Sequence, residues 1–315
     1  MIADCKVLVT GGTGFLGSHL VKELIECRTR TYIFDLSSPD KQALLNNVPR
    51  DSFFYYKIDL RNCDDIEKAI KEIRPEIVFH IGALTDRKRS FENVDSLLDV
   101  NVKGTINLLH SLAQIDYRSF IFVSTSEVYG GADPPFREDM PLNPISPYSA
   151  SKASAEIFCR MLSQMNSKPY TVLRLFNVFG EGQHPDMLIS QLLLSCLEKK
   201  DFEMTKGEQT REFNYVKDIV RALILASTSA RANKEIINIG SGKEISVKDV
   251  ANSVVQLMGS QIKLKLGSIE YREPEIWRMF SDNTKAKELL GWQPEFSLEE
   301  GLKKTIGWTL KYAKC

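Results

Sequence analysis

The sequence lacks a net charge and lacks any segment long enough to cross a membrane. Lys plus Arg and Asp plus Glu each number 41 among 315 residues. No overall field would therefore draw the chain to nucleic acid or to an anionic membrane. No apolar run approaches the roughly 20 residues that span a bilayer, and Asp4 interrupts the start, where a signal peptide would be basic and then apolar. We expect a cytoplasmic protein that binds neither nucleic acid nor membrane.

Cysteine and histidine are few and widely scattered. The cysteines show no C-x-x-C spacing, and the histidines lack the i,i+4 or paired-cysteine spacing that is typical of a zinc site. Their positions are Cys5, Cys27, Cys63, Cys159, Cys196 and Cys315, and His19, His80, His110 and His184. The sequence therefore predicts neither a disulfide framework nor a metal site.

What the sequence does contain is an alternation of short apolar runs with segments of helical period through residues 1–180. Runs such as Val7-Leu8-Val9 and Phe120-Ile121-Phe122-Val123 are typical of buried strands, whereas residues 97–112 have the spacing of a helix. Because parallel strands need crossover connections, this alternation predicts an α/β fold, a doubly wound parallel-sheet Rossmann domain with helices on both faces.

Beyond Gly180 the alternation loosens. Helices are expected over 186–198 and 215–227 and a strand over 236–239. Two further helices are expected after the capping boxes Ser246-x-x-Asp249 and Ser297-x-x-Glu300. We assign residues 1–175, with a returning segment of about 211–240, to the Rossmann domain. Residues 176–210 and 241–315 are assigned to a smaller α/β C-terminal lobe.

A glycine-rich run follows the first expected strand directly and opens a helix. Glycine allows backbone amides to approach a pyrophosphate closely, and the helix N-terminus adds the positive end of its dipole. The order of strand, turn and helix therefore predicts a dinucleotide cofactor site. Its expected contacts are Gly11, Thr13, Gly14, Phe15, Leu16 and Gly17.

The residue that ends the second expected strand selects the cofactor. Asp35 stands where a carboxylate would bond the two hydroxyls of the adenosine ribose. The turn after it, Leu36-Ser37-Ser38, has no cation to neutralise a 2′-phosphate. The sequence therefore predicts NAD in preference to NADP. Asp59, at the end of a strand expected over 55–58, is predicted to bond the adenine amine.

Hydroxyl groups and a carboxylate gather at the end of the strand that contains Phe120. Thr125, Ser126 and Glu127 follow this strand, at the sheet edge where ligands bind in open α/β folds, and all three are predicted to be catalytic. Tyr148 and Lys152 are four residues apart and share one face of a helix. An ammonium beside a phenol favours the phenolate, which is a base able to take a hydroxyl proton while hydride leaves the same carbon for nicotinamide.

Together these patterns resemble the extended short-chain dehydrogenase/reductase family, the NAD-dependent nucleotide-sugar epimerases and dehydratases. The resemblance covers nearly the whole chain. It is carried by Thr10 to Gly17, His80-Ile81-Gly82-Ala83, Asn101, Ser124 to Gly130, Tyr148-Ser149-Ala150-Ser151-Lys152, Arg174 to Gly180, Arg211 to Val216 and Leu290-Gly291-Trp292.

The resemblance implies roles for individual residues. Thr125 would hydrogen-bond the C4 hydroxyl of the sugar, Tyr148 would be the base, and Lys152 would also hold the nicotinamide ribose. Cofactor contacts are implied for Leu60, Ala83 and Asn101. Asn177, Arg211 and Arg272 would grip the nucleotide diphosphate, and Glu275 would bond the nucleotide ribose, where the family often has Asp. The lobe would thus bind a nucleotide-diphosphate sugar.

The net reaction stays open between two outcomes. After oxidation at C4, hydride can return to the other face, as in an epimerase, or water can be lost first, as in a 4,6-dehydratase. Glu127 is the C5 base that dehydratases use, but Ser126 stands where they have an acidic Asp. A UDP-glucuronate decarboxylase and a reductase of 4-keto-6-deoxy sugars are alternatives. A non-catalytic NAD-binding sensor is a further one, although such a protein need not keep Thr125, Tyr148 and Lys152.

The resemblance also implies a homodimer. The dimers of the family pair the helices that span about 95–113 and 148–165 in this chain. Each has more apolar positions than one sheet-facing stripe requires. The residues expected at the interface are Leu98, Ile106, Leu109, Leu112, Ile157, Phe158, Met161 and Leu162.

Overall fold

Seven parallel strands form the central sheet of the computed structural model, which describes residues 2–46, 48–85 and 91–312. The strand order is β3-β2-β1-β4-β5-β6-β11. Their bounds are β1 Lys6–Thr10, β2 Arg30–Asp35, β3 Phe53–Lys57, β4 Ile77–His80, β5 Ser119–Thr125, β6 Thr171–Leu175 and β11 Glu235–Ile239. The direction of winding reverses between β1 and β4, so the predicted doubly wound fold is confirmed.

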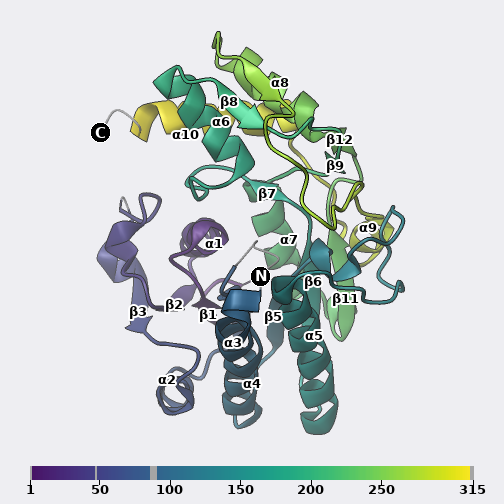
Figure 1. Cartoon of the computed structure of the whole chain (residues 1–315). Helices are drawn as coiled ribbons and strands as arrows, with labels where there is room; N and C mark the ends of the chain where they lie inside the picture. The colour runs from purple at the N-terminus through teal and green to yellow at the C-terminus, as the bar shows by residue number, and fades with distance from the viewer. Residues whose placement is uncertain (1, 47, 86–90, 313–315) are drawn as a thin grey trace.

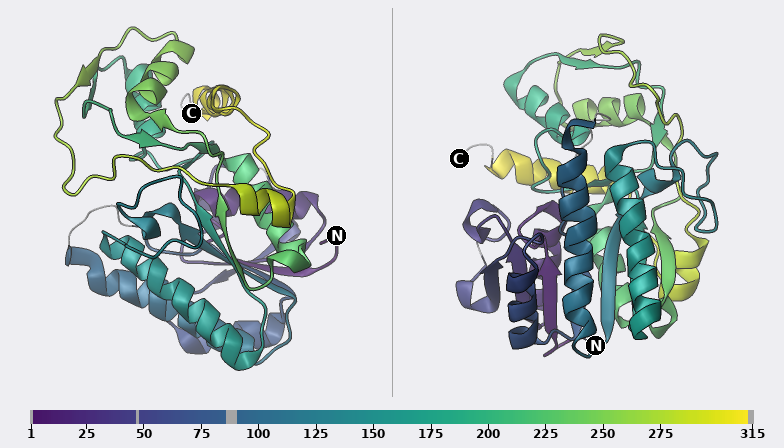
Figure 2. Two further views of the ribbon diagram at one scale, coloured as in Figure 1. Left: turned by 90° about the vertical axis from the view of Figure 1, so that its right-hand side faces the viewer. Right: turned by 60° about the horizontal axis from the view of Figure 1, so that its bottom comes forward.

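Helices cover both faces of this sheet (Figures 1 and 2). Leu8, Val78 and Phe120 point to the face that packs on α2 (Cys63–Ile73), α4 (Gly104–Ala113) and α5 (Pro147–Asn166). Val7, Phe79 and Ile121 point to the other face, which packs on α1 (Phe15–Glu26) and α7 (Val216–Thr228). Because the inner strands are buried on both faces, they read as continuous apolar runs and not as alternating ones.

Several expected elements differ by one or two residues at their ends, and two differences are worth describing. The strand predicted over 55–58 begins earlier, at Phe53, because β3 pairs with β2 from Phe53 opposite Thr31 to Lys57 opposite Asp35. The helix expected over 97–112 is interrupted. A short helix, α3 (Val94–Leu97), passes into a π-helical turn over Leu98–Lys103 before α4 begins. Such a turn inserts extra backbone into a helix and often occurs at functional sites.

The C-terminal lobe lies above the sheet in Figure 1 and has a core of its own. It contains α6 (Leu188–Glu198), α8 (Val247–Leu257) and α10 (Leu298–Tyr312), with the small parallel pair β8 (Phe202–Met204) and β13 (Leu264–Leu266). Ser246 accepts from the amide of Asp249 at 3.0 Å, and Ser297 accepts from the amide of Glu300 at 3.2 Å. The predicted capping box at Ser297 is complete, because its amide also donates to the Glu300 carboxylate at 2.8 Å, whereas Ser246 caps its helix through its side chain alone.

Short strands connect the lobe to the sheet. They are β7 (Val178–Phe179), which pairs with β10 (Asn214–Tyr215), and β9 (Thr210–Arg211), which pairs with β12 (Ile245–Ser246). The residues between β10 and β12 return to the central sheet, where they form α7 and β11. A later helix, α9 (Thr284–Leu290), and Trp292 also pack with the core on the α1 side, although they fall within residues 241–315. The division of the chain into two domains stays a prediction.

Within the part of the chain that the structure describes, the remaining elements are short 3-10 turns at Pro39–Lys41, Arg50–Ser52, Phe91–Asn93, Ser126–Tyr129 and Ala230–Ala232. Across residues 2–46, 48–85 and 91–312, no helix has both the length and the apolar character needed to cross a bilayer.

Candidate active site

Two glycines where β1 passes into α1 leave no room for a side chain. Gly11 has φ +70°, and a Cβ on it would lie 2.7 Å from the Cα of Gly82. A Cβ on Gly17 would lie 2.0 Å from the carbonyl oxygen of Gly11. Helix α1 then begins without a side-chain cap at Gly14, which leaves its first turn open to an anionic ligand. This close-packed turn and uncapped helix suit a pyrophosphate.

Asp35 holds the corner where the adenosine ribose is expected. One carboxylate oxygen accepts from the amide of Thr13, and the other accepts from the amide of Ser37, both at 3.0 Å. The Thr13 hydroxyl donates to the carbonyl of Ser37 at 3.2 Å, and Gln42 donates to the carbonyl of Thr13 at 3.1 Å. Strands β1 and β2 are neighbours in the sheet. The carboxylate at the end of β2 is therefore held against the glycine turn that follows β1.

Asp59 already has a cationic partner. Its carboxylate accepts from Arg61 through Nε and Nη2, and these bonds hold the pKa of Asp59 below its usual range. An adenine amine would have to share this carboxylate with Arg61. Leu60 is buried beside it, and its carbonyl accepts from Asn107 at 3.0 Å.

Asn101 connects the loop after β4 to the catalytic helix. In the π-helical turn, its amide bonds both backbone groups of Leu84, at 2.7 Å and 2.9 Å, next to the predicted cofactor contact Ala83. The same amide donates to the Ser151 hydroxyl at 2.9 Å, which in turn donates to the carbonyl of Tyr148 at 2.7 Å. The Asn101 side chain thus connects the loop after β4 to helix α5 across the site.

His80 connects β4 to β1 and α4 through hydrogen bonds. The sequence had indicated no metal-binding role for it and no other role. Its ring nitrogens bond the hydroxyls of Thr10 at 2.7 Å and Thr105 at 2.9 Å. Complete burial lowers the pKa of His80 to about 3, so the ring is neutral near pH 7. It therefore serves as a neutral hydrogen-bonding spacer between β1, β4 and α4.

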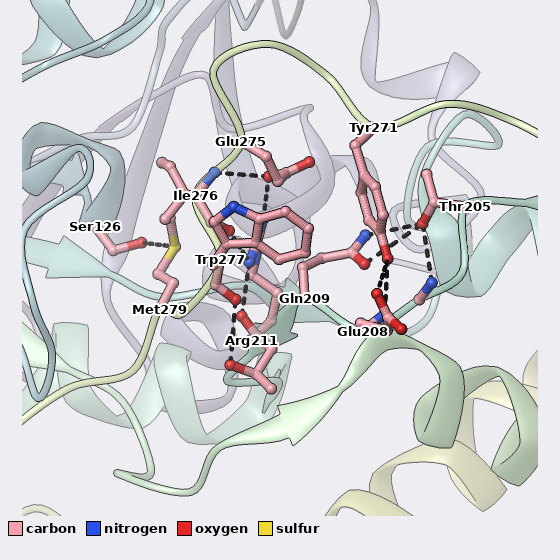
Figure 3. Close-up of polar contacts among 12 residues, drawn as sticks. Ser126, Thr205, Glu208, Gln209, Arg211, Tyr271, Glu275, Ile276, Trp277 and Met279 are labelled. Atoms are coloured by element: carbon pink, nitrogen blue, oxygen red, sulfur yellow. Dashed lines mark hydrogen bonds and ion pairs between the residues drawn. The ribbon is translucent and has the colours of Figure 1, made fainter. Parts of the chain in front are cut away.

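Strand β5 ends at Thr125, whose hydroxyl accepts from the amide of Glu127 at 3.2 Å. This cap starts the turn Ser126–Tyr129 and leaves Glu127 half-buried two residues beyond Thr125. The Ser126 hydroxyl, by contrast, is buried and donates to the Met279 sulfur at 3.1 Å, as Figure 3 shows. The proton of this hydroxyl is therefore taken up by a thioether, and the catalytic role of Ser126 stays a prediction.

Helix α5 presents Tyr148 and Lys152 one turn apart. Its start is fixed by Pro147 and by a reciprocal cap between Ser146 and Ser149. Lys152 is buried, and its ammonium lies 4.1 Å from the centroid of the Phe122 ring. Burial lowers the pKa of Lys152 to about 8, although Cys159 and Glu156 oppose the shift. The ammonium is thus held inside the fold, on the face of the helix that carries Tyr148.

The predicted substrate groups Arg211 and Glu275 lie together on the lobe side of the site (Figure 3). Arg211 donates to the Glu275 carboxylate at 2.9 Å and to the carbonyl of Ile276 at 2.6 Å. Arg272 lies exposed in the same segment, and Asn177 accepts the amide of Asn214 at 2.8 Å through its carbonyl. The structure thus brings Arg211 and Glu275 together, while the contacts of all four predicted groups with a ligand stay predictions.

Sequence reasoning missed an aromatic pair in this segment. The rings of Tyr271 and Trp277 lie 4.8 Å apart, and Trp277 is half exposed. The Tyr271 hydroxyl accepts from the amide of Glu208 at 3.1 Å and donates to its carboxylate at 3.3 Å (Figure 3). Tyr271 and Trp277 flank Arg272 and Glu275 in a stretch without helical period, and this pattern was the available sequence signal for the pair.

Comparison with known proteins finds relatives over nearly the whole chain. The family model described as GDP-mannose 4,6 dehydratase matches residues 8–305. The chain is 32% identical over 311 residues to the UDP-glucuronate 4-epimerase of Thermodesulfobacterium geofontis, covering 96% of this chain and 95% of that protein. It is 32% identical over 321 residues to the dTDP-D-glucose 4,6-dehydratase of Bos taurus, covering 96% and 88%.

The chain is also similar to a solved structure. The UDP-glucuronic acid 4-epimerase of Bacillus cereus, in complex with UDP-glucuronic acid and NAD, matches with a TM-score of 0.90 at 28% identity, covering 97% of this chain and 99% of that one. The shared fold, the glycine turn and the Thr125, Tyr148 and Lys152 set lead to one conclusion. The chain belongs to the extended short-chain dehydrogenase/reductase family, the NAD-dependent nucleotide-sugar epimerases and dehydratases.

Proposed function

We propose that this enzyme is an NAD-dependent 4-epimerase of UDP-sugars. The observation that carries the choice is the contact between Ser126 and Met279. Elimination of water needs a base for the C5 proton and an acid for the departing hydroxyl. Next to Glu127 the chain has a buried serine hydroxyl in place of a carboxylic acid. Epimerisation needs neither group, because only the C4 oxygen exchanges a proton.

The residues of the glycine turn and Asp35 fit NAD. The turn leaves no room for a Cβ at Gly11 or Gly17, and Asp35 offers a carboxylate that a 2′-phosphate would repel. When bound, NAD would accept hydride from C4 and return it. Lys152 would hold the nicotinamide ribose, and Asn101 would keep the loop at Ala83 in place.

The chain's own residues would handle the proton. Tyr148, as phenolate, takes the proton of the C4 hydroxyl while Thr125 donates a hydrogen bond to the same oxygen. The Lys152 ammonium stabilises the negative charge on Tyr148. Arg211 and Arg272 hold the diphosphate, so that the sugar can turn and receive hydride on its opposite face. Tyr148 then returns the proton and C4 has inverted.

UDP as the nucleotide is supported by relatives, since the epimerases of T. geofontis and B. cereus are both named for UDP-glucuronate.

A second candidate is a 4,6-dehydratase. Glu127 favours it, because a half-buried carboxylate two residues after Thr125 is suited to remove the C5 proton.

The test is the mass and NMR spectrum of the products. The purified enzyme is incubated with UDP-glucose, UDP-galactose, UDP-glucuronate and dTDP-glucose, with the Tyr148→Phe variant as the inactive control. A product of unchanged mass and new NMR spectrum supports the epimerase. A product lacking one water supports the dehydratase, and one lacking carbon dioxide would point to a decarboxylase.

We also propose that the enzyme is a homodimer. On the π-helical turn and α5, large apolar side chains face outward: Leu98, Ile157, Met161 and Met165 are exposed. Ile106, Phe158 and Leu162 are half-buried beside them. The expectation for Leu109 and Leu112 was wrong, because both are buried in the protomer's own core against the sheet. The remaining residues form a face that a second copy would cover.

A further inference from the structure

A buried ion pair lies beneath the candidate active site. Glu156 on α5 and Arg174 on β6 are each 3% exposed. Arg174 donates to the carboxylate through Nη2 at 2.7 Å and through Nε at 3.1 Å and 3.2 Å. Desolvation offsets much of the attraction between two buried ions, so such a pair is a poor source of net stability. Its position suggests another role.

The pair is bonded to both ends of the segment that carries Thr125 and Glu127. Ser124, directly before Thr125, donates its hydroxyl to Glu156 in a short hydrogen bond. Tyr129, two residues after Glu127, accepts from Arg174 at 2.9 Å and donates to Asn238 on β11 at 2.7 Å. The catalytic segment is therefore attached before and after its reactive side chains.

The same pair is attached to the catalytic helix. Tyr148, Lys152 and Glu156 follow one another at intervals of four residues, so they share one face of α5. Glu156 thus stands one turn below Lys152 and two turns below Tyr148. A movement of Glu156 relative to Arg174 would change the separation between the helix and the end of β5.

We propose that Glu156 and Arg174 are positioning residues that set the separation between Thr125 and Tyr148. The proposal rests on the proposed oxidation at C4, in which both side chains must reach one oxygen atom of the sugar. Reactive groups must be held to within about 0.5 Å of their productive geometry, and a misplacement of about 1 Å can lower a rate by about 10²-fold. Four buried hydrogen-bonding partners supply that precision here: Ser124, Tyr129, Glu156 and Arg174.

The test compares three variants of the full-length enzyme with bound NAD. Tyr129→Phe and Ser124→Ala each remove one hydroxyl and keep the ion pair, whereas Glu156→Gln removes its charge. Ser111→Ala is the matched control, because its buried hydroxyl donates only to the carbonyl of Asn107 within α4. The readouts are the rate of NAD reduction after mixing with the active UDP-sugar, the Kd for UDP and the amount of NAD retained.

We expect the reduction rate to fall by about tenfold or more in the three network variants, in keeping with the cost of a misplaced reactive group. The Kd for UDP and the NAD content should stay within about twofold, and Ser111→Ala should match the wild type. Should Glu156→Gln fail to fold, the two hydroxyl variants still decide. Wild-type rates in both of them would overturn the proposal, and so would an equal loss of UDP binding.

A wild-type enzyme that turns over no UDP-sugar would refute the proposed function and not this inference. Crystal structures of the variants then test the positioning role independently of activity. Tyr129→Phe should shift residues 125–127 relative to Tyr148, and a variant that superposes on the wild type over both segments would overturn the positioning role.

Discussion

Arg211 and Glu275, which lie 64 residues apart in the chain, bond each other at 2.9 Å. Both were predicted to bind the nucleotide, and here they also bond each other. Arg211 also donates to the carbonyls of Thr210 and Ile276, at 2.7 Å and 2.6 Å. The guanidinium therefore holds the segment around Glu275 against β9.

Replacement of Arg211 should weaken nucleotide binding. Arg211→Ala removes a charge-assisted donor expected to face the diphosphate, and such a bond contributes about 1.5 to 3 kcal/mol. We expect the Kd for UDP, measured by calorimetry, to rise about tenfold or more. Arg137→Ala is the control, because Arg137 pairs with Asp139 on the surface. Equal affinity in the Arg211→Ala variant would remove this residue from the nucleotide site.

Asp35 should determine the choice of cofactor. Asp35→Ala is expected to weaken NAD binding by about 1 to 3 kcal/mol, the scale of lost charged hydrogen bonds. The measurement is the affinity of the stripped enzyme for NAD and for NADP, with Asp40→Ala, an exposed carboxylate in the following turn, as the control. A wild-type enzyme that binds both cofactors equally would contradict the prediction.

The turnover number should fall as pH rises through about 8. Burial lowers the pKa of Lys152 to about 8, so the ammonium that stabilises the Tyr148 phenolate is present below that pH and lost above it. The profile of kcat against pH checks this. Lys152→Arg, whose guanidinium keeps its charge, should lose the alkaline decline if it retains measurable activity. A wild-type profile that stays level well above pH 8 would count against the role of this ammonium.

Glu127 separates the two candidate reactions. In an epimerase, Glu127→Gln should lower activity by about tenfold or less, which is about 1.4 kcal/mol. In a dehydratase the variant should still oxidise C4 while elimination falls by about 10² to 10⁴-fold, the usual cost of losing a general base. Near-ultraviolet absorbance of reduced nicotinamide and product mass distinguish these outcomes. Elimination at the wild-type rate in the variant would refute Glu127 as the base.

The proposed dimer should dissociate when a charge enters its apolar face. Met161→Glu would place a carboxylate in an apolar contact, and burial of an unpaired charge is costly. We expect a monomer by light scattering at micromolar concentration. Leu310→Glu on α10 is the matched control, since Leu310 and Met161 are each 39% exposed. A wild-type protein that is itself monomeric would end the proposal.

The sequence by itself determined the features that depend on residues close together in the chain. Val7-Leu8-Val9 and the glycines that follow predict a strand, a turn and a helix because their constraints are local. Asp35 ends its strand, and Tyr148 and Lys152 share a helix face, by spacing alone. The fold class, the family and NAD therefore followed from the sequence.

Only the tertiary structure decided which distant side chains meet. Spacing along the chain did not reveal that Met279 covers the Ser126 hydroxyl or that Arg211 takes Glu275 as its partner. It also did not reveal that Glu156 pairs with Arg174 beneath Lys152. A hydroxyl, a carboxylate and a guanidinium have the same bonding capacity in every sequence. Their partners are chosen by the packing of strands and loops that are remote in the chain, because burial requires each polar group to find a partner within reach.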